Sequence, residues 1–183
     1  ANNYIIGLSM LLSDGWKVLG ITVDGRKGII PTLKTYAPVQ FCQFHQTAIV
    51  TRYLGKYPKL QANWELKRIS LLLKDISKDK LKDLLTSWYL KYEQFLKEKT
   101  YHDSGRWSYT HRRTRSCFRS LIHNSDDLFT YREFPCMPNT TNCVDGYISY
   151  LRTLHRSHRG TKLHRRRKIT EEILRGKPTK NYN

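Results

Sequence analysis

A carboxylate stands at the end of an apolar run near the start of the chain. Residues 16–23 are rich in β-branched and apolar side chains and give way at once to Asp24 and Gly25, a pattern that predicts a buried strand. Open α/β sheets keep their chemistry at the carboxyl-terminal ends of such strands. Asp24 is therefore the first candidate for a catalytic or metal-binding carboxylate.

A second carboxylate, Asp145, lies in the first turn of a helix predicted in the last third of the chain. The segment Pro-Asn-Thr-Thr-Asn-Cys-Val-Asp-Gly at residues 138–146 leads into this helix, which continues to residue 160. Helical spacing puts Asp145 on the same face as Arg152, Arg156 and Arg159, at one end of a phosphate-binding track. The alternative is structural: Asn142 followed three residues later by Asp145 resembles a capping box, and the residues alone favour that cap.

Cys42 and His45 are separated by two residues, which is a spacing seen in zinc sites. Two ligands are only half of a structural zinc site, and no second pair stands at a matching spacing. We therefore predict no zinc, and instead a buried thiol and a hydrogen-bonded imidazole that support the neighbouring strand. The other cysteines, Cys117, Cys136 and Cys143, are scattered and are expected to be free thiols.

The surplus of positive charge indicates a polyanionic partner. The 183 residues include 33 Lys and Arg against 15 Asp and Glu, a net charge of +18, for which nucleic acid is the default partner. Between residues 101 and 119, arginines are interleaved with aromatic side chains that can stack on bases; alternatively, these aromatics form core while the arginines face water. The candidate DNA-binding residues are Arg26, Lys27, Arg112, Arg113, Arg115, Arg152, Arg156 and Arg159.

The same composition disfavours a membrane protein. No apolar run in the chain approaches the roughly 20 residues needed to span a bilayer, and no secretion signal is visible at the N-terminus. We therefore expect no membrane partner and a cytoplasmic, nucleoid-associated location.

The elements that would position these groups change in character along the chain. Residues 1–45 predict helix, strand, helix and strand, with the second strand over residues 39–44, as in an α/β sheet covered by helices. In residues 46–135 the apolar side chains recur at the spacing of amphipathic helices. This pattern predicts an all-helical insertion, in which Ser77 caps the longest helix. Residues 136–160 would form a core helix, and residues 161–183 a basic tail with a short amphipathic helix. The expected fold class is α/β, mainly helical by residue count.

Five segments, in this order, resemble the catalytic core of bacterial Mutator-type (MULE-like) insertion-sequence transposases. They are Val-Asp-Gly-Arg-Lys-Gly at residues 23–28, Cys-Gln-Phe-His at 42–45, Trp-Ser-Tyr-Thr-His-Arg at 107–112, the segment at 138–146, and His-Arg-Gly at 158–160. The resemblance implies a ribonuclease H-like core in which three acidic residues, usually Asp-Asp-Glu, hold two divalent metal ions. It makes Asp24 the second acidic residue and Asp145 the third, where the family usually has Glu. It also makes Cys42 and His45 a recurrent motif beside the second acidic residue.

The resemblance further implies cleavage of DNA phosphodiester bonds and strand transfer at transposon ends. The partners would be terminal inverted repeats and target DNA, bound by a homo-oligomer of the full-length protein. Mg²⁺, or Mn²⁺ in its place, suits carboxylate ligands.

The first acidic residue is not expected among these residues, because Asp14 lies in a predicted turn and not on a strand. We therefore expect an incomplete core from the C-terminal part of a transposase, inactive alone. The alternative function is that of a catalytically inactive basic remnant that binds nucleic acid.

Overall fold

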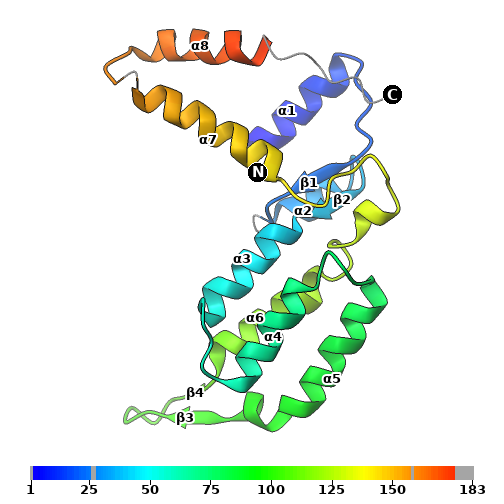
Figure 1. The fold of residues 1–183 in the computed structure, drawn as a ribbon, viewed down its shortest axis with the longest axis vertical. Coiled ribbons are helices and arrows are strands. Elements are labelled where there is room, and N and C mark those ends of the chain that lie inside the picture. The colour runs from blue at the N-terminus through cyan, green and yellow to red at the C-terminus, as the bar shows by residue number, and fades with distance from the viewer. Residues whose placement is uncertain (1, 26–27, 158, 176–183) are drawn as a thin grey trace. The chain divides into compact units, whose positions relative to one another are not determined.

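The computed structural model describes residues 2–25, 28–157 and 159–175 (Figure 1). The chain divides into two units, Ala1–Thr141 and Asn142–Asn183. The described residues form eight α-helices, one short 3-10 helix and four strands of three residues each. The prediction that the chain is mainly helical by residue count is confirmed.

The first unit opens with the predicted order of helix, strand, helix and strand. These elements are α1 (Asn2–Ser13), β1 (Ile21–Val23), α2 (Ile29–Leu33) and β2 (Val39–Phe41). The two strands pair in parallel, with Ile21 opposite Val39 and Val23 opposite Phe41, and α2 forms the connection between them. A small apolar cluster joins them to α1; it consists of Leu8, Val23, Ile29, Leu33 and Val39.

Both strands are shorter than predicted. The expected strand over residues 16–23 is formed only at Ile21–Val23, and Trp16 and Leu19 are 66% and 62% exposed. The reason is that a strand persists only where it has a partner, and β2 offers three residues. β2 in turn ends at Phe41, because Gln43 already lies in the first turn of the next helix.

All three residues of β2 are buried, including the polar Gln40, whose side chain is fully buried. Its amide nitrogen donates hydrogen bonds to the carbonyl oxygens of Leu128 (2.9 Å) and Phe41 (2.7 Å), and its amide oxygen accepts one from the backbone N–H of Tyr131 (2.9 Å). A buried amide with these partners avoids the cost of an unsatisfied polar group. Gln40 therefore ties β2 to the segment around the 3-10 helix (Thr130–Arg132).

Four helices form the larger core of the first unit (Figure 1). They are α3 (Gln43–Leu54), α4 (Gln61–Leu71), α5 (Lys78–Lys97) and α6 (Arg112–Asn124); α3 packs against α4 and α6, and α4 against α5. Ser77 caps α5 as predicted, since its hydroxyl accepts a hydrogen bond from the N–H of Lys80 at 3.1 Å. The buried residues of this core are Phe41, Val50, Leu54, Ala62, Leu66, Ile69, Leu73, Leu81, Leu85, Trp88, Leu96, Cys117, Leu121, Leu128 and Phe129.

The segment predicted as an all-helical insertion contains a β-hairpin, so that prediction is wrong in this part. Strand β3 (Lys99–Tyr101) pairs antiparallel with β4 (Trp107–Tyr109). Aromatic and β-branched residues favour strands, and Gly105 adopts a φ of +74° in the connection, which favours glycine. The hairpin joins α5 to α6.

The second unit consists of two helices, α7 (Asn142–Ser157) and α8 (Leu163–Arg175). They contact one another through a hydrogen bond of 3.0 Å between His155 Nε2 and the hydroxyl of Thr170. α7 ends at Ser157 and not at residue 160 as predicted; Gly160, with a φ of +93°, lies in the turn that follows. α8 occupies the place of the predicted basic amphipathic helix.

Among the described residues, none of the helices combines the length and the apolar composition needed to cross a membrane.

Candidate catalytic site

Asp24 lies where two parallel strands end. It directly follows β1, and the last carbonyl of that strand, on Val23, accepts a hydrogen bond of 2.8 Å from the N–H of Cys42, which directly follows β2. The Asp24 side chain is exposed. The carboxylate is thus presented to solvent from the carboxyl-terminal tip of both strands, where α/β proteins commonly place functional groups.

Gly25 fixes the course of the chain immediately after Asp24. Its φ is +79°, and a Cβ at this position would overlap the ring of Phe41. Phe41 is buried and belongs to the larger helical core, so the backbone of the Asp24 tip rests directly on that core. Arg26 and Lys27, two of the predicted DNA-binding residues, lie outside the described residues.

Cys42 and His45 hold Thr141 at the same tip, in an arrangement that we call the Thr141 clasp. The fully buried thiol of Cys42 accepts a hydrogen bond of 3.3 Å from the N–H of Thr141 and lies 3.2 Å from His45 Nδ1. The Thr141 hydroxyl lies 3.3 Å from the same ring nitrogen. The Cys-x-x-His pair therefore contacts a segment that is 99 residues away in sequence from Cys42.

The residues before Thr141 add further bonds to both strand ends. The carbonyl of Pro138 accepts a hydrogen bond of 2.8 Å from the hydroxyl of Thr22 in β1. The carbonyl of Asn139 accepts one of 3.0 Å from the N–H of Gln43, and its side-chain amide donates one of 3.1 Å to the Gln43 side chain. Residues 138–141 thus lie against the carboxyl-terminal ends of β1 and β2.

The described residues do not by themselves assemble a metal centre. Among them, no group of three or more His, Cys, Asp and Glu side chains is arranged to hold a metal ion. Asp24 belongs to the first unit, whereas Asp145 belongs to the second, where it is exposed in the first turn of α7. The assignments of Mg²⁺ or Mn²⁺ to these two carboxylates, and of no zinc to Cys42 and His45, remain predictions.

The predicted DNA-binding arginines of α6 have different environments. Arg112 and Arg113 are exposed in its first turn. The guanidinium of Arg115, in contrast, lies 3.6 Å from the centre of the Tyr109 ring and donates a hydrogen bond of 2.6 Å to the carbonyl of Leu96. Arg115 therefore fastens the β-hairpin to α6 and has little freedom to bind a phosphate.

The aromatic residues interleaved with these arginines divide between the two roles considered above. Phe118 stacks on Trp88 and Tyr89 with ring centroids 5.3 and 5.4 Å apart, so it is a core residue. Trp107 is 47% exposed, and the ammonium group of Lys99 lies 4.1 Å from its ring. The exposed ring of Trp107 has a face of the kind that a base could stack on.

In the second unit, Arg152 and Arg156 are exposed on α7, while Arg159 is exposed beyond the end of that helix. The three arginines therefore do not form one continuous helical track.

Comparisons of the chain with protein-family models, with curated proteins and with solved structures gave no match. The resemblance to transposases consequently stands on the five sequence segments.

Proposed function

We propose that the chain is part of the catalytic core of a Mutator-type transposase, which cleaves DNA phosphodiester bonds and transfers strands at transposon ends. One observation carries the proposal: Asp24 follows β1 at the joint end of two parallel strands, and residues 138–141, which lead to Asp145, are bonded to the same strand ends. The sequence motifs that resemble the family thus include both the strand tip and the segment held against it.

The Thr141 clasp gives the Cys-x-x-His motif a specific task in this proposal. The N–H of Cys42 donates a hydrogen bond to the carbonyl of Val23, the residue before Asp24, and the Cys42 sulfur accepts one from the N–H of Thr141. The clasp would therefore hold the segment that precedes Asp145 in the sequence against the strand tip that carries Asp24.

In this proposal the two carboxylates hold the metal ion. When bound, a divalent metal lowers the pKa of an attacking water and stabilises the leaving oxygen. The exposed arginines would hold the phosphates of the transposon end. The remaining strands of a ribonuclease H-like sheet, including the one that bears the first acidic residue, are also part of the proposal.

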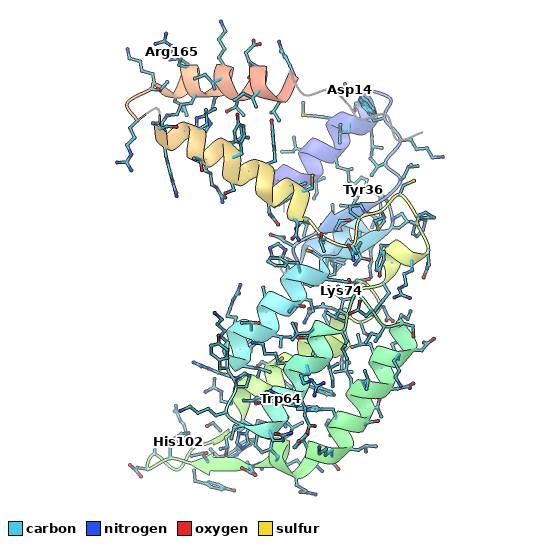
Figure 2. All side chains as sticks on the ribbon, in the orientation of Figure 1. Asp14, Tyr36, Trp64, Lys74, His102 and Arg165 are labelled. Carbon is cyan, nitrogen blue, oxygen red and sulfur yellow. The ribbon has the colours of Figure 1, made fainter. Side chains whose placement is uncertain are left out.

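Metal binding by the carboxylates can be tested on the chain itself with Fe²⁺ in place of Mg²⁺. Bound Fe²⁺, supplied with ascorbate and peroxide, cleaves the polypeptide beside its ligands. We expect cuts next to residues 24 and 145, and their loss in Asp24→Asn. The matched control is Asp14→Asn, because Asp14 lies in the turn after α1, away from the strand ends (Figure 2). Cuts that persist in Asp24→Asn would show that this carboxylate holds no metal.

A second candidate function is a basic nucleic-acid-binding protein without catalysis. It is favoured by the net charge of +18 and by the exposed arginines of α6 and α7. The two candidates separate in a Mg²⁺-dependent nicking assay on inverted-repeat DNA, which compares this chain, a version extended at its N-terminus, and Asp24→Ala in both. Nicking that depends on Asp24 supports the transposase core, whereas DNA binding without nicking in either form supports the second candidate.

A further inference from the structure

A groove lies between α3 and α6 and begins beside the Asp24 tip. Its first part, about 670 Å³, has Gly25 and Gly28 at one end, Arg52 from α3, and Arg119 and His123 from α6. Its second part, about 630 Å³, continues to the start of α6. The two parts share Tyr53 and Ser116. We call the whole the α3–α6 groove; it lies entirely within the first unit.

One face of α6 supplies a regular row of side chains to this groove. Arg112, Ser116, Arg119 and His123 line it, at successive spacings of four, three and four residues, which put them on one side of a helix. With a rise of about 1.5 Å per residue, the row is about 16 Å long. Arg52 on α3 adds a further cation to the groove.

The charge of the groove is unbalanced. Among the described residues, its lining includes four arginines and no Asp or Glu; the arginines are Arg52, Arg112, Arg113 and Arg119, and His111 and His123 also line it. All four arginines are exposed, and none takes part in an ion pair among the described residues. Uncompensated cations in a groove raise the local concentration of anions.

The lysines of the first unit are placed differently. Asp126 forms ion pairs with Lys78 at 3.2 Å and with Lys82 at 3.0 Å, and Glu65 forms one with Lys91 at 2.7 Å. Lys78, Lys82 and Asp126 do not line the α3–α6 groove, and Glu65 and Lys91 line a different hollow, on α4 and α5. Of the residues that line the groove, His111 pairs with Glu98 at 2.9 Å, but among the described residues no carboxylate forms an ion pair with a groove arginine.

Polar and apolar side chains both line the groove. Its first part has Ile30, Phe41 and Ile49 beside Ser120 and Asn124. Ser120 and Asn124 are held by the buried side chain of Gln46, which accepts a hydrogen bond of 2.8 Å from Asn124 and donates one of 3.3 Å to Ser120. The arginines of the groove suit a sugar–phosphate chain, most of whose protein contacts are made to phosphates and sugars.

We propose that the α3–α6 groove binds the sugar–phosphate backbone of DNA and leads it to the tip at Asp24. Binding in the groove follows from its own charge and lining, whereas delivery of the backbone to Asp24 for cleavage rests on the proposed function. Sequence reasoning missed Arg52, because only the packing of α3 on α6 brings it into one groove with Arg119 and His123.

The salt dependence of DNA binding tests the groove. The affinity of the full chain for a fluorescein-labelled DNA duplex is measured by anisotropy between about 50 and 200 mM salt. The double variant Arg52→Gln/Arg119→Gln should bind more weakly, and the slope of log affinity against log salt should become shallower by about 1.8, because each lost phosphate contact removes about 0.9. Arg52→Lys/Arg119→Lys keeps both charges and should keep the slope.

The matched control is Lys74→Gln/Lys80→Gln, which removes the same charge outside the groove; both lysines are exposed, and Lys74 is marked in Figure 2. Its slope should equal that of the parent chain. An equal loss of slope in both double variants would assign the effect to net charge and overturn the proposal, as would an unchanged slope in the arginine variant. Circular dichroism melts confirm that the variants are folded.

The same measurements separate the groove from catalysis. A groove that shows the expected slopes, while neither this chain nor its version extended at the N-terminus nicks DNA, would refute the transposase function and leave the DNA-binding groove standing.

Discussion

Replacing Gly25 by Ala tests whether the Asp24 tip is built on the helical core. The substitution has two costs. A φ of +79° is left-handed, and a residue with a Cβ is strained there by about 1–2 kcal/mol. The new Cβ would also overlap the ring of Phe41, and overpacking of a core costs about 1–3 kcal/mol. The sum is about 2–5 kcal/mol. This is a large part of the free energy of unfolding of a domain, which is about 5–15 kcal/mol.

Gly28→Ala is the matched control for this substitution. Gly28 has a φ of +77°, but a Cβ there would have nothing within 4 Å, so only the strain of about 1–2 kcal/mol remains. Urea unfolding followed by circular dichroism gives both free energies. We expect Gly25→Ala to be the more destabilising by about 1–3 kcal/mol, the contribution of overpacking.

A double-mutant cycle identifies the cause of that difference. Phe41→Leu shortens the side chain under Gly25, so it should destabilise the Gly25→Ala protein less than it destabilises the parent chain; the difference is the coupling energy of the two sites. Equal costs for Gly25→Ala and Gly28→Ala, or additive effects of Gly25→Ala and Phe41→Leu, would refute the conclusion that the tip rests on Phe41.

Three further predictions concern the thiols, the clasp and a surface ion pair. Burial raises the pKa of Cys117 to about 12, and Cys42 is fully buried. A thiol reagent at neutral pH should therefore label the exposed Cys136 and Cys143 far faster than these two buried thiols. Equal labelling rates for all four cysteines would contradict this packing. Thr141→Val removes the hydroxyl group that lies beside His45 Nδ1, and it should lower the free energy of unfolding by about 0.5–1.5 kcal/mol. The control Thr140→Val, one residue earlier, should change this free energy less. An equal loss for both variants would argue against the clasp. Hydrogen bonds from Lys82 and Lys78 hold the pKa of Asp126 below its ordinary 3.8. A carboxyl whose pKa is lowered by folding stabilises the protein above its unfolded pKa and loses that contribution as the pH falls through its folded pKa. Asp126→Asn should therefore cost less than about 1 kcal/mol at pH 7, since the ion pairs are exposed, and this cost should vanish as the pH falls through the folded pKa of Asp126. A cost that persists in acid would assign the effect to something other than the charge.

Much of the local structure follows from the sequence, whereas the burial of two glutamines does not. The order of elements up to β2 and the cap at Ser77 depend on neighbouring residues, and both were predicted. The burial of Gln40 and Gln43 depends on partners far along the chain: Leu128 is 88 residues from Gln40, and Leu73 is 30 residues from Gln43. No local pattern distinguishes a glutamine that bonds such carbonyls from one that faces water.

The site shows the same division between local and distant information. Asp24 could be placed at a strand end from the residues around it, but Thr141 could not be connected to Cys42 without the fold. Arg115 and Arg119 are four residues apart on α6, yet the first lies over Tyr109 of the β-hairpin and the second lines the groove. Their different environments depend on where the hairpin packs, which the sequence pattern around each arginine does not encode.

The helical bundle determines where the Asp24 tip stands. A two-stranded sheet alone is marginally stable at best in water, but here the outer side of β2 is held by non-strand partners: the N–H of Phe41 donates to the carbonyl of Asp127 at 2.7 Å, and Gln40 bonds Leu128. The ring of Phe41 belongs to the same core as Val50 of α3 and Leu121 of α6. Because α3 and α6 also form the arginine-lined groove, the carboxylate and the proposed DNA track are positioned by one packed core. Any change that separates α3 from α6 should therefore weaken DNA binding and displace Asp24 together.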